Sequence, residues 1–135
     1  MRDFIAKHAI YISCEPVHSN PNVAPDTFGK DAQHWRCILT LRADGKPREM
    51  VVFFSQGAAF TGAPSAESVL ECLASDAASL RGIGGFPEWA ADLGYDSDSR
   101  KAEATYMAVA RQTRSLRRWL ASSETMAELL SVARE

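Results

Sequence analysis

The spacing of apolar residues changes once along the chain, near Gly57, and this change is the strongest constraint on the fold. Before Gly57, apolar and polar residues alternate in short runs, which is typical of β-strands. After it, apolar residues recur every three or four positions, which is typical of helices. We therefore predict an α+β fold, in which a three-stranded antiparallel sheet in the N-terminal half packs on one face against about four C-terminal helices.

Three strands are predicted, over Ala9–Val17, His34–Arg42 and Arg48–Ser55. The Asp44-Gly45 pair is a strong hairpin signal and joins the second strand to the third. Pro16 indicates an edge strand or a strand end, because proline cannot donate to a sheet ladder. The loop of about fifteen residues over Ser19–Gln33 has a length at which loops tend to be functional or mobile.

Capping signals divide the second half into four helices. Ser65 is predicted to cap the first, which buries Leu70, Leu73, Ala77 and Leu80. A short helix follows over Phe86–Gly94, after a glycine-rich turn at residues 82–85. A long helix is predicted from about Ser99 to Ala121, and a last one begins after Ser122 or Ser123.

The chain of 135 residues has the size of a single domain, and we expect residues 1–135 to form one. No apolar run is long enough to cross a bilayer, so no membrane association is expected. No signal peptide is recognisable, and the three cysteines, an odd number without a CxxC pair, favour a reducing cytoplasm with free thiols. Nothing in the sequence indicates a metal site or another cofactor.

The net charge of −2 conceals a division along the chain. Residues 49–99 hold eight acids and one base, a local charge of −7. Residues 100–118 hold six bases and one acid, a local charge of +5. If the two segments touch, their charges largely neutralise each other, whereas if they face apart, each is a candidate binding surface.

The acidic string Asp96-Ser97-Asp98-Ser99 resembles the start of a calcium-binding loop. An EF-hand loop requires glycine at its sixth position and glutamate at its twelfth, and this sequence has Lys101 and Met107 there. We interpret the acids instead as caps of the long helix.

A basic stripe is predicted on the long helix, where Arg111, Arg114 and Arg118 are spaced i, i+3 and i+7 and Arg117 widens the stripe. These guanidinium groups could bind phosphates, pair with the acids of residues 49–99, or be solvated. No aromatic residues interleave them to stack on bases, which favours a protein partner or internal pairing.

An enzymatic alternative would pair Cys37 or Cys72 with one of His8, His18 and His34. The spacing gives no support for such a site, so we expect no enzymatic activity.

Several segments resemble a family of small proteins from bacteriophages and prophages. They occur in the family's order over residues 19 to about 118, and are Ser19-Asn20-Pro21-Asn22, His34-Trp35-Arg36-Cys37, Phe54-Ser55-Gln56-Gly57, the stretch from Val69 to Asp76, and the stretch from Asp92 to Glu103. The resemblance implies a cytoplasmic accessory protein of a phage or mobile element. Small phage proteins of this kind include inhibitors of host defence, anti-CRISPR proteins among them.

Two functional hypotheses follow. In the first, the chain binds a host defence complex, for which a CRISPR effector is the candidate, and its acids block a surface that binds nucleic acid. The candidate acids are Glu67, Glu71, Asp76, Glu88, Asp92, Asp96 and Asp98. In the alternative, Arg111, Arg114, Arg117 and Arg118 bind nucleic acid directly. The sequence is compatible with a monomer or a homodimer.

Overall fold

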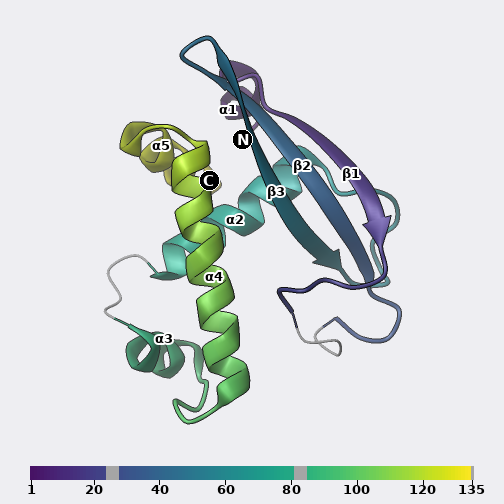
Figure 1. Ribbon diagram of the computed structural model, residues 1–135, viewed down its shortest axis with the longest axis vertical. Coiled ribbons are helices and arrows are strands. Elements are labelled where there is room, and N and C mark those ends of the chain that lie inside the picture. Colours follow the sequence, from purple (N-terminus) through teal and green to yellow (C-terminus); the bar gives the residue numbers. More distant parts are fainter. Residues whose placement is uncertain (24–27, 81–84, 135) are drawn as a thin grey trace.

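The computed structural model describes residues 1–23, 28–80 and 85–134 (Figure 1). The elements in chain order are α1 (Arg2–Lys7), β1 (Tyr11–Val17), β2 (Gln33–Ala43), β3 (Lys46–Gln56), α2 (Ala66–Leu80), α3 (Phe86–Leu93), α4 (Arg100–Trp119) and α5 (Ser123–Ala133). The predicted α+β class and the sheet of three antiparallel strands are confirmed. Helix α1 is not predicted from the sequence, because its six residues bury only Phe4 and are too few to show a period.

The order of the sheet is β1-β2-β3, so β1 and β3 are both edge strands. The β2–β3 turn consists of Asp44 and Gly45, which have φ angles of 54° and 75°. Two positive φ angles define a type I′ hairpin, in which the pair that flanks the turn is hydrogen-bonded. Ala43 and Lys46 are that pair, and hydrogen-bonded pairs recur at every second position along the ladder.

All the larger helices lie on one side of the sheet (Figure 1). On that side the sheet buries Cys37, Leu39 and Leu41 of β2 and Met50 and Val52 of β3. The opposite face is open, as the exposure of Tyr11 (67%) and Val51 (44%) shows. This arrangement confirms that helices cover one face only.

The apolar stripes predicted on the helices pack against this buried face. They form one hydrophobic cluster with it, to which α2 contributes Leu70, Leu73 and Ala77, α4 contributes Leu116, Trp119 and Leu120, and α5 contributes Met126, Leu129 and Leu130. Burying each large side chain contributes about 1.5–3 kcal/mol, so the cluster is the main source of stability.

Serine caps fix where the helices begin. The Oγ atoms of Ser65, Ser99 and Ser122 accept hydrogen bonds from the amides of Ser68 (3.1 Å), Ala102 (3.2 Å) and Thr125 (3.2 Å). Gly94, with a φ of 77°, ends α3 in the left-handed conformation. These caps confirm the predicted boundaries of the helices. Of the turn predicted at 82–85, residues 82–84 lie outside the described residues, as do residues 24–27 of the predicted loop.

Helix α3 is held against α4 by its own group of aromatic residues. Trp89, which is 2% exposed, stacks on Tyr95 at 5.3 Å between ring centroids and lies 5.4 Å from Tyr106 of α4. Phe86 lies 5.7 Å from the same Tyr106 ring. Figure 1 shows α3 beside the N-terminal half of α4 and away from the sheet.

Candidate interaction surfaces

Four of the candidate acids lie together at the α3 end of the molecule. Glu88 and Asp92 are one helical turn apart on α3, and Asp96 and Asp98 follow in the turn to α4. All four are exposed. We call these four residues the acidic tip. Glu88 and Asp92 form no ion pair with any side chain in the described parts of the chain.

Capping accounts for part of the acidic tip. The Asp96 carboxylate accepts a hydrogen bond of 3.0 Å from the amide of Asp98, just before Ser99 caps α4. The negative charges also lie at the N-terminus of α4, where they oppose the helix dipole. Glu88 likewise lies in the first turn of α3 and opposes the dipole of that helix, whereas Asp92 has no such role. Neither carboxylate forms an ion pair with a described side chain, so both are available to a partner.

The remaining three acids lie elsewhere. Glu67 and Glu71 are one turn apart in the first half of α2, which Figure 1 shows near the sheet and far from α3. Asp76 lines a cleft of about 210 Å³ between the sheet, α2 and α4. The seven acids therefore form separate groups and do not share one continuous face.

Burial changes the chemistry of the cleft. It raises the pKa of Asp76 from 3.8 to about 6. Cys72 lines the same cleft with its side chain still exposed to solvent. Partial desolvation by its neighbours raises its pKa to about 11, and the negative charge of Asp76 adds to this rise. A cysteine nucleophile needs a lowered thiol pKa, so Cys72 is poorly suited to nucleophilic catalysis.

The other candidate nucleophile, Cys37, is fully buried on the inner face of the sheet. Its Sγ lies 3.0 Å from Sγ of Cys14, the residue directly opposite on β1. Burial, together with the neighbouring Cys14, raises the pKa of Cys37. Both thiols therefore lie on the core side of the sheet, with Cys37 buried and Cys14 half-buried.

Two of the three histidines contact groups other than these thiols. His34 Nδ1 lies 2.7 Å from Oγ of Ser55, and His8 Nε2 lies 3.4 Å from a carboxylate oxygen of Glu128. Among the described hydrogen bonds, none joins a histidine to a cysteine, so the geometry of a cysteine–histidine pair is not formed there.

The basic stripe lies on the C-terminal half of α4, where Arg111, Arg114, Arg117 and Arg118 are all exposed. None of the four forms an ion pair with an acid in the part of the chain that the structure describes. Internal pairing, one of the three interpretations of the stripe, is therefore not observed for these arginines.

The arginines do not share a single surface. Arg118 lines a groove of about 400 Å³ between α4 and β3, where Arg48 donates a hydrogen bond of 3.1 Å to the carbonyl of Arg118. Arg117 lines a separate hollow of about 350 Å³ together with Met126 and Leu130. Two neighbouring residues thus face different surroundings.

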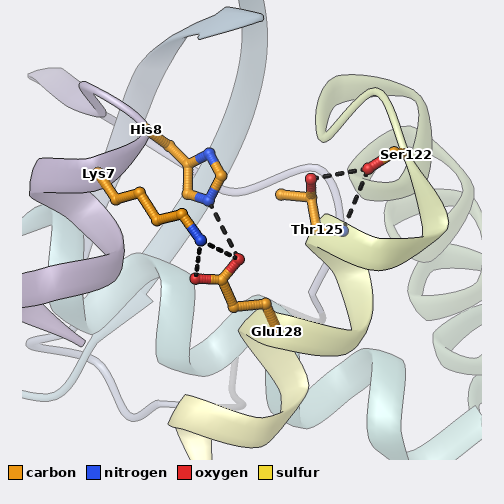
Figure 2. A network of polar contacts seen from close by, with 5 residues as sticks. All are labelled: Lys7, His8, Ser122, Thr125 and Glu128. Carbon is orange, nitrogen blue, oxygen red and sulfur yellow. Dashed lines mark hydrogen bonds and ion pairs between the residues drawn. The ribbon is translucent and has the colours of Figure 1, made fainter.

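Two polar anchors are structural features that the sequence patterns do not indicate. Asn20 is 6% exposed, and its side chain donates hydrogen bonds to the Phe53 carbonyl (3.2 Å) and to Ser55 Oγ (2.8 Å). The second anchor joins the ends of the chain, because Lys7 Nζ lies 3.1 Å from Glu128 Oε1 on α5 (Figure 2). The asparagines of the loop are visible in the sequence, but their long-range partners are not.

A search of the described residues finds no cluster of three or more His, Cys, Asp or Glu side chains able to hold a metal ion. In the same part of the chain, no helix is both long and apolar enough to span a bilayer. Comparisons of the sequence and the structure with family models, curated proteins and solved structures return no match.

Proposed function

We propose that this chain is a non-enzymatic, cytoplasmic binding protein of a phage or mobile element that inhibits a host defence complex. The resemblance to small phage and prophage proteins supports the origin. The observation that supports the mechanism is the acidic tip, in which Glu88 and Asp92 are exposed and unpaired with described side chains.

The acidic tip carries its charge on a rigid support. Trp89, Tyr95 and Tyr106 hold α3 in place beside α4, so the backbone that carries Glu88 and Asp92 is already ordered before a partner binds. Protein grooves that bind nucleic acid are lined by lysine and arginine, which supply most of the attraction for phosphates. We propose that the acidic tip occupies such a groove on a CRISPR effector and so acts as an anti-CRISPR protein.

Charge reversal at the acidic tip tests this proposal. In bacteria with an active CRISPR system, expression of the chain is expected to restore plaque formation by a targeted phage. The double variant Glu88→Lys/Asp92→Lys should abolish that effect, because it replaces attraction with repulsion, and should no longer recover the effector in a pull-down. The matched control is Glu67→Lys/Glu71→Lys, which makes the same charge change at the same helical spacing on α2 and should behave like the parent.

Three results would contradict the proposal. These are no protection of the phage, recovery of no defence complex, or equal loss of activity in both double variants.

A second candidate function, direct binding of nucleic acid, is favoured by the absence of acidic partners for Arg111, Arg114, Arg117 and Arg118 within the described residues. It predicts a gel shift in which the logarithm of the binding constant falls linearly with the logarithm of salt concentration. In the pull-down above, this function would appear as nuclease-sensitive recovery that survives Glu88→Lys/Asp92→Lys.

A further inference from the structure

The free edge of β3 faces a groove that the proposed function does not use. The groove has a volume of about 400 Å³ and is lined by residues 48–51 of β3 and by Ser115, Arg118 and Trp119 of α4. Four consecutive strand residues on one wall mean that the groove follows the edge of the sheet. A strand edge of this kind is a template for pairing with another strand.

The hairpin geometry identifies the backbone groups that face the groove. Because Ala43 and Lys46 are a hydrogen-bonded pair, Pro47, Glu49 and Val51 direct their backbone groups away from β2. Pro47 has no N–H to offer, which is consistent with this assignment. The N–H and C=O groups of Glu49 and Val51 have no hydrogen-bond partner among the residues described in the structure.

The chain closes the next part of the same edge itself. Phe53 follows Val51 in the same outward orientation, and its carbonyl accepts the 3.2 Å hydrogen bond from Asn20. A buried asparagine therefore caps the edge at Phe53 but leaves Glu49 and Val51 open. The open groups lie where the groove is.

The charge of the groove selects the chemistry of a partner. Arg48 and Arg118 both line it, and Arg111 lies on the same side of α4 as Arg118, seven residues earlier. Glu49 also lines the groove, but its side chain alternates with that of Met50 and lies on the open face, away from α4. None of these three arginines pairs with an acid in the described ranges. Carboxylates are the peptide groups that guanidinium groups bind best, through charge-assisted hydrogen bonds.

We propose that this groove binds an extended acidic segment of another protein, which adds to β3 as a fourth strand. The backbone of the segment would pair with Glu49 and Val51. Its alternate side chains would point toward α4, where carboxylates meet Arg118 and Arg48. The intervening side chains would lie on the open face beside Val51. Because Val51 is an apolar side chain that is 44% exposed, apolar side chains of the segment are favoured there.

A second copy of this chain is a poorer occupant. Antiparallel pairing of two β3 edges would extend one sheet and place both α4 helices on the same side of it, facing each other. Arg111 and Arg118 of the two copies would then lie opposite one another, and like charges across an interface are unfavourable.

A synthetic peptide tests the proposal directly. The probe is the acetylated and amidated hexapeptide Glu-Val-Glu-Val-Glu-Val, titrated into the full chain by calorimetry. Hydrogen–deuterium exchange should show the amides of Glu49 and Val51 exchanging freely without peptide and protected with it. An analogue that is N-methylated on its valines keeps the charge but loses edge donors, and should bind at least about tenfold more weakly.

Two neighbouring arginines provide a matched pair of variants. Arg118→Glu reverses a charge in the groove and should lower the affinity for the peptide by about tenfold or more. Arg117→Glu makes the same change in the separate hollow and should change the affinity little. Val51→Pro removes an edge N–H that has no partner in the described structure. It should lower the affinity for the peptide and leave the circular dichroism spectrum unchanged.

The proposal fails if the N-methylated analogue binds as tightly as the parent peptide, because attraction would then be electrostatic alone. It also fails if the peptide does not bind, if a single-stranded oligonucleotide protects Glu49 and Val51 and the peptide does not, or if a dimer of the chain already protects them. The variant Glu88→Lys/Asp92→Lys should leave peptide binding unchanged, so this test is independent of the acidic tip.

Discussion

At the scale of single residues, Asp76 shows how burial alters the pKa of a carboxyl group. Its neighbours in the cleft include Thr105, Val109 and Gln112, and burial raises its pKa from 3.8 to about 6. The folded protein therefore holds a proton on Asp76 at pH values where the unfolded chain has lost it.

Because folding raises its pKa, the Asp76 side chain should lower the free energy of unfolding as pH increases. Between pH 4 and pH 6 the folded state binds more protons at this site, so its contribution to the free energy of unfolding falls as pH rises through that window. Asp76→Asn should remove this fall and stabilise the protein by about 1–2 kcal/mol at pH 7.5, with little difference near pH 4.

Urea unfolding at pH 4 and pH 7.5 measures the effect. The control is Asp92→Asn, which changes an exposed acid on α3 and should preserve the pH profile of the parent. Parallel profiles for the parent and Asp76→Asn would show that the carboxyl is not desolvated.

At the scale of elements, Asn20 ties the loop after β1 to the edge of β3. Its side chain makes three hydrogen bonds, donating to Phe53 O and Ser55 Oγ and accepting from the amide of Asn22 (2.9 Å). It is 6% exposed, so solvent replaces these partners poorly.

Asn20→Ala should reduce the free energy of unfolding by about 2 kcal/mol, because it leaves buried polar groups without partners. Asn22→Ala is the matched control, since the Asn22 side chain makes no hydrogen bond within the described residues. Chemical denaturation of both variants gives the comparison, and equal stabilities would show that the loop is not anchored through Asn20.

The elements themselves were largely predictable, because their signals are local. The Asp44-Gly45 turn, the serine caps and the left-handed Gly94 each act within a few residues, so their effect can be inferred from spacing. Helix α1 could not be predicted because its six residues bury only Phe4 and are too few to show a period. The Asn20 anchor could not be predicted because its partners are distant in the sequence. The same limit applied to the acids, whose division among α2, α3 and the cleft depends on helix packing.

At the scale of the whole molecule, an ion pair connects the first helix to the last. Figure 2 shows Lys7 and His8, at the end of α1, directed toward Glu128 of α5. The hydrogen bond from Lys7 lowers the pKa of Glu128, and His8 adds to the effect.

Because this pKa is lowered by folding, Glu128 stabilises the protein at pH values above its ordinary pKa of 4.5, and the contribution is lost as pH falls. Glu128→Gln should therefore destabilise the protein at pH 7, by less than about 1 kcal/mol because Lys7 is exposed, and added salt should shrink the loss. Thermal unfolding at low and high salt measures this. Glu71→Gln is the control and should match the parent, because Glu71 is an exposed acid beyond the first turn of α2 and has no described ion pair.

The partial cap on β3 also bears on how the protein behaves at high concentration. Segments of about six or seven residues with high β-propensity are an aggregation hazard when they lie on an exposed sheet edge, because strands of other copies can pair with them. Here Asn20 closes the edge at Phe53, and Pro47 withholds an N–H at the other end. Within the described part of β3, Glu49 and Val51 are therefore the residues that still offer both outward backbone groups, which shortens the stretch of this edge with which another copy can pair.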